Sequence, residues 1–276
     1  MPTNNPIANH YLHGDLLQSI ESALPALGKT TETVTVADLA PVDEFHIGGR
    51  IATDHLFEQL SFSEQSYLLD VGCGLGGAAR YVTTKYKNRV AGIDLTPEYI
   101  ETGNAICRWM NLENSIELLE GSALSMPYQS NSFDGSYMFH VGMNIKDKAA
   151  LFSELARVLK PGSGFGVYDI MRRTDEAIVF PVPWATDSST SHIDSAKAYQ
   201  ELLEAAGFEI SVITSRGDFA LKFFKQLSAK SKANGGPPPL GLHTLMQEGT
   251  ANKIKNMVDN IANGIIEPVE IIARLK

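Results

Sequence analysis

The sequence lacks the features of a membrane-spanning, secreted or metal-dependent protein. None of its apolar runs reaches about 18 residues, the length that a transmembrane helix needs. Its two cysteines, Cys73 and Cys107, offer neither a disulfide framework nor metal-ligand spacing. The polar residues 1–10 are not typical of a signal peptide. We therefore expect a cytoplasmic protein with no stable membrane insertion and no metal site.

The sequence also lacks an excess of positive charge. Its 23 Lys and Arg residues against 32 Asp and Glu residues give a formal net charge of −9. This argues against a nucleic-acid partner, because affinity for nucleic acids depends mainly on neutralising phosphates. The basic stretch 222–232 carries apolar side chains at helical spacing and is interpreted as a solvated helix face. We expect a small-molecule partner, and the sequence is compatible with an oligomer.

The most informative segment that is present is residues 68–77, Leu-Leu-Asp-Val-Gly-Cys-Gly-Leu-Gly-Gly. An apolar strand that turns sharply into a helix needs glycine, because the backbone takes special φ/ψ values and approaches a ligand closely. Two spacings fit. Gly72, Gly74 and Gly77 match the dinucleotide pattern, whereas an acid-x-Gly-x-Gly-x-Gly pattern typical of S-adenosylmethionine enzymes starts at Asp70.

A second short strand, residues 89–95, ends on Asp94 and Leu95. Asp94 follows the glycine turn by about 20 residues, the distance at which a carboxylate accepts the hydroxyls of an adenosine ribose. Both cofactor types would use such a carboxylate. The alternative is that Asp94 only caps the helix expected after Thr96-Pro97-Glu98.

Three later segments distinguish the two cofactors. These are residues 120–128, residues 132–140 with Ser-Phe-Asp at their start, and residues 151–162, which end on Leu-Lys-Pro-Gly. Together with the glycine turn they resemble class I S-adenosylmethionine-dependent methyltransferases of the small-molecule "type 11" kind over roughly residues 42–170. Nicotinamide dehydrogenases lack these later segments. The resemblance implies an α/β fold, a Rossmann-like doubly wound seven-stranded sheet whose last strand is antiparallel, with N-terminal helices and a cap.

The chain divides into two expected parts. Residues 1–60 form an N-terminal helical cap segment, in which residues 11–28 predict an amphipathic helix ending at Gly28. Residues 61–276 form the S-adenosylmethionine-binding methyltransferase domain, with insertions at 171–194 and 217–264. A chain of 276 residues, 43% of them hydrophobic, can bury one such core.

Strands alternate with longer segments from Tyr67 to Ile170, which predicts five parallel strands with a helix in each crossover. A helix over 195–206 and a strand over 208–214 follow. The final strand is expected at Ile265–Leu275. Pro268 should confine it to a sheet edge or to a start just after the proline, because proline cannot donate to a strand ladder.

The resemblance implies roles for the cofactor-binding residues. Gly72 and Gly74 allow backbone contact with the methionine moiety, Asp70 orients that loop, Asp94 holds the ribose and Leu95 lies on the adenine. The family usually has Asp after the glycine at position 121, where this chain has Ser122. A hydroxyl can still accept a hydrogen bond from the adenine, and the backbone of Ala123 and Leu124 can supply others.

Residues 46–53, His-Ile-Gly-Gly-Arg-Ile-Ala-Thr, are similar to a stretch of phosphoethanolamine and sarcosine/dimethylglycine methyltransferases. In those families the stretch crosses the methionine end of the cofactor. The similarity assigns Gly49 and Arg50 to the cofactor site, where a guanidinium is well suited to a carboxylate. The alternative is that Arg50 is an exposed residue at a helix start.

The acceptor is expected after the fourth strand, in residues 139–144. Related enzymes tend to carry Asp or Glu at the position of His140 and His at that of Asn144, so this chain differs at both. His140 is the candidate general base, because imidazole titrates near neutral pH. Alternatively, it only bonds backbone beside the cofactor. Met143 and Trp184 complete the expected acceptor pocket, although a Trp between prolines can equally plug its loop onto the core.

These residues predict transfer of a methyl group from S-adenosyl-L-methionine to a small-molecule acceptor: an amine, a hydroxylated aromatic or a prenyl-type molecule. The reaction is an in-line displacement with a good leaving group, so the protein mainly aligns the reactants and removes a proton where necessary. The alternative is a non-catalytic S-adenosylmethionine-binding or regulatory module of the same fold. Ser122 and the missing histidine at 144 favour that alternative slightly.

Overall fold

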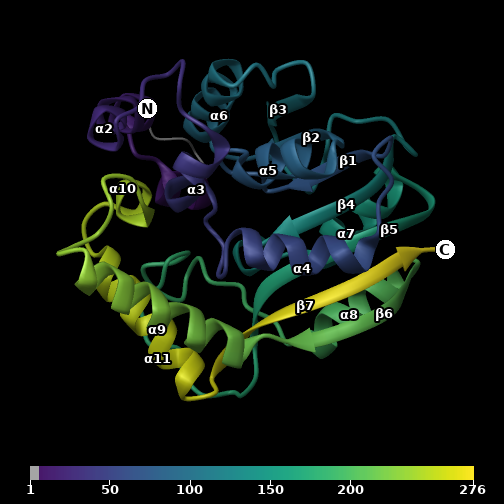
Figure 1. Cartoon of the computed structure of the whole chain (residues 1–276). Coiled ribbons are helices and arrows are strands. Elements are labelled where there is room, and N and C mark those ends of the chain that lie inside the picture. Colours follow the sequence, from purple (N-terminus) through teal and green to yellow (C-terminus); the bar gives the residue numbers. More distant parts are fainter. Residues whose placement is uncertain (1–5) are drawn as a thin grey trace.

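The computed structural model describes residues 6–276, which form an α/β fold around one seven-stranded sheet (Figure 1). The strand order is β3-β2-β1-β4-β5-β7-β6, and β7 alone runs against the other six. This confirms the predicted Rossmann-like sheet with an antiparallel last strand. The strands are β1 (Tyr67–Val71), β2 (Arg89–Asp94), β3 (Ile116–Glu120), β4 (Phe133–Phe139), β5 (Leu159–Arg172), β6 (Phe208–Ser215) and β7 (Ile266–Leu275).

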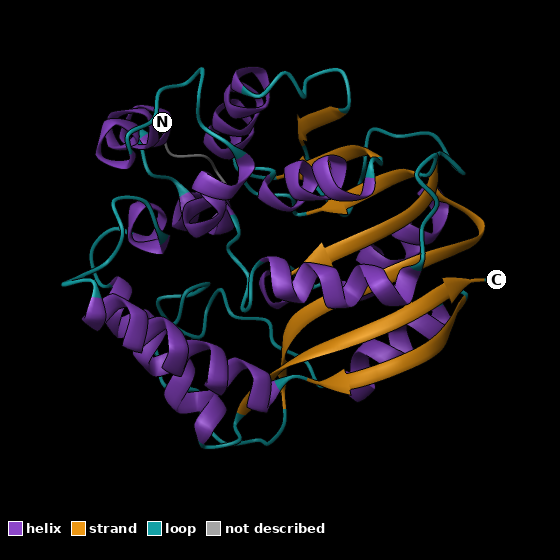
Figure 2. Cartoon of the chain, viewed as in Figure 1, coloured by secondary structure: helices purple, strands orange, loops and turns teal. Residues whose placement is uncertain are grey.

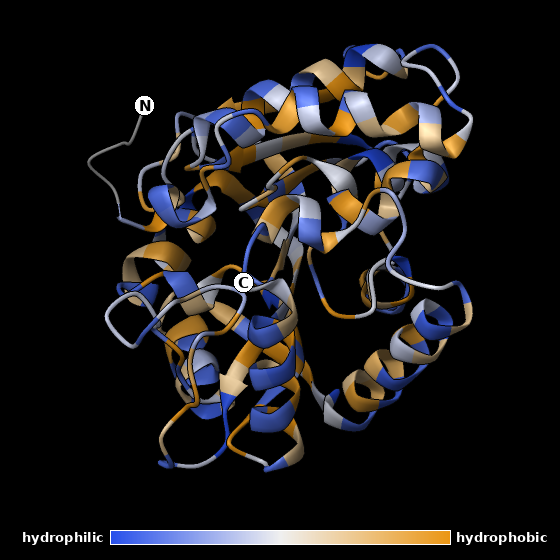
Figure 3. Ribbon diagram, turned by 90° about the vertical axis from the view of Figure 1, so that its left-hand side faces the viewer, coloured by the Kyte–Doolittle hydropathy of each residue, from blue (hydrophilic) through white to orange (hydrophobic). Residues whose placement is uncertain are grey.

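The central strands are apolar on both faces because helices cover both. Leu68 packs into the hydrophobic cluster on one face of the sheet and Leu69 into the cluster on the other, as alternating strand residues must. Figure 1 shows α4 and α5 in front of the sheet and α7 and α8 behind it. These helices, with α6 beside α5, are α4 (Arg50–Leu60), α5 (Gly77–Tyr86), α6 (Pro97–Trp109), α7 (Lys148–Val158) and α8 (Ala196–Ala205). In Figure 3 the hydropathy colours alternate along the helices, which matches their one-sided burial.

The remaining helices gather on the side where the parallel strands end (Figure 1). The N-terminal segment packs on α6 and on α10, and α9 packs on α11 and β7. These elements are α1 (Pro6–Tyr11), α2 (Leu16–Ala23), the 3-10 helix η1 (Leu24–Leu27), α3 (Val36–Asp43), α9 (Gly217–Ala233), α10 (Leu242–Met246) and α11 (Thr250–Ala262). None of the helices in residues 6–276 is long and apolar enough to cross a membrane.

The expected N-terminal helix over 11–28 is divided in the structure. α1 ends at Tyr11, α2 starts at Leu16, and the last turn before Gly28 is a 3-10 helix. Pro25 stands near the start of this turn, and Gly28 ends it with a φ of 68°. Residues 1–5 of the expected cap segment lie outside the described part of the chain.

The expected boundary between segments 1–60 and 61–276 falls at the end of α4, a helix that packs on one face of the sheet. α4 packs directly on β5 and β7. A Cβ on Gly166 of β5 would lie 2.8 Å from Leu60 Cδ1, so glycine lets this helix approach closely. The last part of segment 1–60 therefore covers the core as α5 does.

The connection between β3 and β4 differs from the expectation of a helix in each crossover. Residues 121–132 contain no helix, and Figure 2 draws this connection as loop. A tight turn closed by a bridge between Ser122 and Ser125 starts the connection. Burial of Met126 then fastens it to the core. This loop stands beside the carboxyl end of β3, where it can contribute backbone to a site.

Pro268 lies inside β7, which starts at Ile266 and runs between β5 and β6, so neither the expected edge position nor the expected start just after the proline is correct. β7 pairs with β5 on one side, with Ile170 opposite Pro268, and with β6 on the other. The carbonyl of Pro268 accepts a hydrogen bond from the N–H of Arg216, just past the end of β6. In an antiparallel ladder the N and O of one residue point to the same side. The missing donor of Pro268 therefore faces Arg216, and the return bond that proline cannot make would lie just past Ser215, the last residue of β6.

Candidate functional site

A cavity of about 380 Å³ lies at the carboxyl ends of β1, β2 and β4. Open α/β sheets bind ligands at this edge, where the strand order reverses between β1 and β4. One part of the cavity wall is formed by Asp70, Gly72, Cys73, Gly74, Leu75, Ala78, Ile93, Asp94, Leu95, Thr96, Tyr99, Gly121, Ser122, Ala123 and Leu124. The other part is formed by Ile7, Tyr11, Asp43, Phe45, His46, Phe139, His140, Val141, Asn144, Ile145, Lys146, Asp147, His192 and Leu245.

The glycine turn after β1 forms the floor of the cavity. Gly72 and Gly74 have φ values of 69° and 54°, a backbone region that favours glycine. A Cβ on Gly72 would also lie 2.4 Å from Val141 Cγ2. The N–H groups of Gly72 and Cys73 donate to the carbonyl of Ile93 across 2.8 and 3.1 Å, which fixes the turn against β2. The turn has the shape that the sequence pattern predicts.

Asp94 holds the turn and the start of α6 together. One carboxylate oxygen accepts from the N–H of Gly74 and the other from the N–H of Thr96, both across 2.9 Å. Burial raises the pKa of this carboxyl, and the two N–H donors oppose the rise. Each oxygen keeps a lone pair for a further donor such as a ribose hydroxyl. The two alternatives, helix capping and ligand binding, are therefore compatible at Asp94.

Asp70 is the most unusual group in the cavity wall. Its side chain is buried, and Oδ2 has no hydrogen-bond partner among the described residues. Burial raises the pKa of Asp70 to about 8, and the nearby Tyr137 hydroxyl, which lies outside hydrogen-bond geometry, opposes the rise. A buried acceptor without a partner costs free energy unless a ligand supplies the donor or the positive charge. The cavity therefore fits a ligand with a cationic or N–H-bearing end beside β1.

Four further predicted cofactor residues line the same cavity: Leu95, Ser122, Ala123 and Leu124. The Oγ of Ser122 accepts a hydrogen bond from the N–H of Leu124 across 3.2 Å. The hydroxyl hydrogen of Ser122 remains free to donate. An adenine on this side could therefore meet a hydroxyl donor where related enzymes present a carboxylate acceptor.

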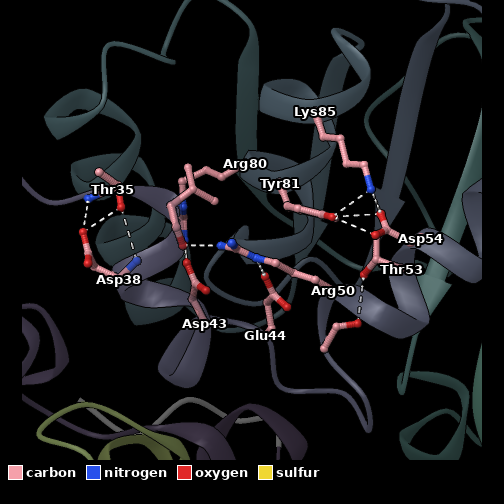
Figure 4. Close-up of polar contacts among 12 residues, drawn as sticks. Thr35, Asp38, Asp43, Glu44, Arg50, Thr53, Asp54, Arg80, Tyr81 and Lys85 are labelled. Carbon is pink, nitrogen blue, oxygen red and sulfur yellow. Dashed lines mark hydrogen bonds and ion pairs between the residues drawn. The ribbon is translucent and has the colours of Figure 1, made fainter.

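Gly49 and Arg50 are not part of the cavity wall. The Arg50 guanidinium donates to Glu44 Oε1 across 2.7 Å and to the carbonyl of Val36, and it stacks over the ring of Tyr81 (Figure 4). Burial raises the pKa of Glu44 to about 7, and Arg50 opposes that rise. Arg50 therefore fixes the segment before α4, and the structure does not bring it to a ligand carboxylate.

Trp184 and Met143 are also absent from the cavity wall. Trp184 is 2% exposed, packs in the core and donates from Nε1 to Ser191 Oγ across 3.0 Å. A tight turn between Val182 and Ala185 presses the ring inward. Met143 is buried in the 3-10 helix η2 (Gly142–Asn144). The alternative in which Trp184 plugs its loop onto the core matches the structure.

His140 lines the cavity, but its hydrogen bonds do not suit a general base. The N–H of Ile47 donates to Nε2 of His140 across 3.0 Å. Nε2 must therefore be the acceptor nitrogen, and in the neutral ring the proton sits on Nδ1. Burial lowers the pKa of His140 well below its usual value, and Nδ1 has no partner among residues 6–276. His140 has no free lone pair with which to take a proton.

The cavity also contains residues that are not among the predicted site residues. Tyr11 donates to Oδ1 of Asn144 across 3.3 Å, which brings α1 to the wall formed by η2. His46 comes from the quoted Gly-Gly motif, and that motif was the available signal for it. Asp43 forms a buried ion pair with Arg80 across 2.8 Å and supports the glycine turn from behind (Figure 4). No cluster of described residues is arranged to hold a metal ion.

The fold and the glycine turn agree with the resemblance to S-adenosylmethionine methyltransferases, and comparison with known proteins supports it over part of the chain. Residues 69–166 match the family model Methyltransf_11, described as a methyltransferase domain. Residues 69–166 therefore match the type 11 methyltransferase domain to which the sequence is similar. The matched range runs from β1 into β5 and includes the glycine turn, Asp94 and Ser122.

Individual relatives share part of this chain. Methyltransferase GfsG of Streptomyces halstedii is 28% identical over 64% of this chain and 65% of its own length. Phosphoethanolamine N-methyltransferase 1 of Arabidopsis thaliana is 29% identical over 65% of this chain and 36% of its own length. Geranyl diphosphate C-methyltransferase of Streptomyces coelicolor A3(2) has the same fold, with a TM-score of 0.70 at 16% identity over 100% of both chains. The chain spans less than two thirds of the length of the curated relatives named here.

Proposed function

We propose that the protein transfers a methyl group from S-adenosylmethionine to a small-molecule acceptor. One observation carries the proposal: the glycine turn, Asp94 and Asp70, whose Oδ2 has no hydrogen bond among the described residues, all line one cavity at the carboxyl ends of β1 and β2. The glycine turn offers backbone groups that a ligand can approach closely. Asp94 offers a carboxylate that can accept from hydroxyl groups, and Asp70 offers a buried carboxyl that can face a positive charge. The matched methyltransferase domain supports the same conclusion.

The cofactor residues divide by the part of the ligand they would hold. Gly72, Gly74 and Asp70 would hold the methionine moiety, and Asp94 would accept from the ribose hydroxyls. Leu95 and Ser122, with the backbone of residues 123–124, would border the adenine. When bound, S-adenosylmethionine supplies an activated methyl group with a good leaving group. The remaining work of the protein is to align the acceptor and exclude water.

The acceptor classes in question are amines, hydroxylated aromatics and prenyl-type molecules. A library of these compounds, assayed for S-adenosylhomocysteine formation, tests the proposal directly. We expect turnover with at least one class. If the protein binds S-adenosylhomocysteine but no acceptor is methylated, the non-catalytic binding module becomes the better account. Ser122 and Asn144, which differ from the residues usual in related enzymes, are the observations behind that alternative.

The net charge and the state of the cysteines support a proposal for the kind of partner and for the cellular compartment. A net charge of −9 supports a small-molecule partner over a nucleic acid. Cys73 and Cys107 are both free and buried, which supports the reducing cytoplasm. An oligomer remains compatible with this account, and sedimentation of the purified chain measures it.

A further inference from the structure

His46 presents a free nitrogen in the acceptor part of the cavity. Its Nε2 lies 3.0 Å from the carbonyl oxygen of Gly49 and 3.0 Å from Oγ1 of Thr53. A carbonyl can only accept, so Nε2 carries the proton and donates. The hydroxyl of Thr53 in turn faces the same carbonyl at 3.5 Å, which leaves a Thr53 lone pair for the ring. Both contacts fix the imidazole through the start of α4.

The other ring nitrogen of His46, Nδ1, is the acceptor nitrogen of this tautomer. It makes no hydrogen bond to any residue in the described part of the chain. His46 lines the cavity and stacks on Phe139, with ring centroids 4.4 Å apart. Burial lowers the pKa of His46 to about 4, so the ring is neutral at pH 7 and its lone pair is available.

His46 and His140 are thus held in opposite tautomers. Their ring centroids are 6.4 Å apart, and two nearby backbone groups set both tautomers. The Gly49 carbonyl accepts from Nε2 of His46, and the Ile47 N–H donates to Nε2 of His140. The lone pair on Nε2 of His140 accepts the hydrogen bond from Ile47, whereas the lone pair on Nδ1 of His46 accepts none from the described residues. Among these two cavity histidines, only His46 can accept a proton.

The charges around the cavity restrict the acceptor. Among residues 6–276, Lys146 is the one lysine that lines it and no arginine does. Asp43, Asp70, Asp94 and Asp147 also line it, but Asp43 is paired with Arg80, and burial raises the pKa of Asp70 to about 8. Burial lowers the pKa of His140 and that of His192 as well, so neither adds positive charge at neutral pH. A buried phosphate or carboxylate needs several cationic or N–H donors. The single lysine and the absence of arginine among the described lining residues do not meet this need.

The cavity that His46 lines also has apolar side chains in its wall, among them Phe139, which stacks on His46, and Ile7, Phe45, Val141, Ile145 and Leu245. An ammonium group has three donors and would lose hydration against such walls. A hydroxyl has one donor, which matches the one free acceptor of His46. Apolar area with a single polar group that fixes orientation is typical of a small-molecule site.

The geometry points to His46 as the proton acceptor of the acceptor site, and to an uncharged, mainly apolar molecule with a hydroxyl group as the acceptor. This inference rests on the proposed methyl transfer. The hydroxyl oxygen forms a bond to the methyl carbon, and the carbon–sulfur bond breaks with its electron pair going to sulfur. The hydroxyl proton moves to Nδ1 of His46. The products are a methyl ether, S-adenosylhomocysteine and an imidazolium. As the oxygen is alkylated its proton becomes strongly acidic, so a weakly basic imidazole suffices.

Nuclear magnetic resonance of the protein with ¹⁵N-labelled histidine tests the geometry without turnover. We expect His46 to carry its proton on Nε2 and His140 on Nδ1, with the signals assigned from His46→Gln and His140→Asn. The probe is 2-naphthol added to the protein saturated with S-adenosylhomocysteine. It should shift the Nδ1 signal of His46, whereas 2-naphthyl phosphate and the ammonium form of 2-naphthylmethylamine should bind at least about tenfold more weakly.

Kinetics with S-adenosylmethionine and 2-naphthol test the proton transfer. A glutamine at position 46 can bond the Gly49 carbonyl but cannot take a proton. His46→Gln should therefore lower kcat by about 10²- to 10⁴-fold and leave S-adenosylhomocysteine affinity unchanged. Added imidazole should restore part of the rate of His46→Ala. His55→Gln is the matched control, because His55 lies on α4 outside the cavity wall and should keep its rate.

The outcomes separate this inference from the proposed function. Failure of the wild-type protein to bind S-adenosylhomocysteine would overturn the proposed function itself. If it binds, four results overturn the inference alone: a proton on Nδ1 of His46, no binding of 2-naphthol, equal or tighter binding of the phosphate or the ammonium probe, or full activity of His46→Gln.

Discussion

The backbone N–H of Ile47 donates to the Nε2 atom of His140 across 3.0 Å and so joins the segment before α4 to the end of β4. His140 itself has a φ of 55°, which is uncommon for residues other than glycine. The strained backbone and the hydrogen bond both hold the ring in one place. This relationship fixes His140 in the cavity wall and occupies the nitrogen with which its neutral ring would accept a proton.

The first prediction concerns His140→Asn. Asparagine tolerates a positive φ, so the variant should fold, and kcat with an identified acceptor should fall by less than about tenfold because no proton transfer is lost. Steady-state kinetics over a range of acceptor concentrations measures the change. A loss of 10²-fold or more in kcat with an unchanged KM would restore His140 as the general base.

The second prediction concerns Trp184, whose ring is buried away from the cavity. Trp184→Ala should lower the free energy of unfolding by about 3–5 kcal/mol, since it leaves a large void and an unpaired Ser191 hydroxyl. Affinity for S-adenosylhomocysteine should stay unchanged under conditions where the variant is folded. Urea unfolding and calorimetry measure the two quantities. Wild-type stability combined with a raised KM for the acceptor would place Trp184 in the pocket after all.

How far the sequence predicts this molecule depends on the range of the interactions involved. The glycine turn and Asp94 are predictable because each follows a strand directly, and strand, turn and helix are local features. The orientation of Trp184 depends on a loop folding onto distant core residues, and no local pattern encodes that. Pro268 shows the same limit: its tolerance depends on where another strand, β6, stops.

The sequence also does not show which of the two cavity histidines, His46 or His140, can accept a proton. Both were visible in the sequence, and His140 was the natural candidate because it follows a strand whose carboxyl end faces the cavity. The choice between them depends on which nitrogen of each ring meets a donor or an acceptor. Those partners are the N–H of Ile47, 93 residues from His140, and the carbonyl of Gly49. Sequence spacing does not reveal such hydrogen bonds.

The third prediction concerns the close approach of α3 to α5. A Cβ on Gly77 would lie 2.1 Å from the carbonyl oxygen of Asp43, so backbone must shift to accept one. Gly77→Ala should destabilise the fold by about 1–3 kcal/mol and weaken cofactor binding, because the glycine turn precedes this residue. The matched control is Gly217→Ala, whose nearest contact would be an ordinary 3.6 Å. Equal stabilities of the two variants in urea unfolding would contradict the packing described here.

The fourth prediction is a pH dependence of stability in the ligand-free protein. Burial raises the pKa of Asp70 from 3.8 to about 8, so the native state keeps a proton that the unfolded chain releases. The contribution of Asp70 to stability should therefore fall as the pH rises from about 4 to about 8. Asp70→Asn removes this contribution. Urea unfolding at pH 5 and pH 8 should show the wild type losing more stability than the variant, and parallel losses would contradict the raised pKa.

The fifth prediction tests the central claim, that this cavity binds S-adenosylmethionine through the glycine turn and Asp94. The measurement is calorimetric titration of the wild type and of Asp94→Ala with S-adenosylhomocysteine, with NADH as the competing ligand. We predict that the wild type binds S-adenosylhomocysteine far more tightly than NADH. Asp94→Ala should weaken that binding by about 1–3 kcal/mol through lost charged hydrogen bonds. Tight binding of NADH with no heat from S-adenosylhomocysteine, or an unchanged affinity in Asp94→Ala, would contradict the account.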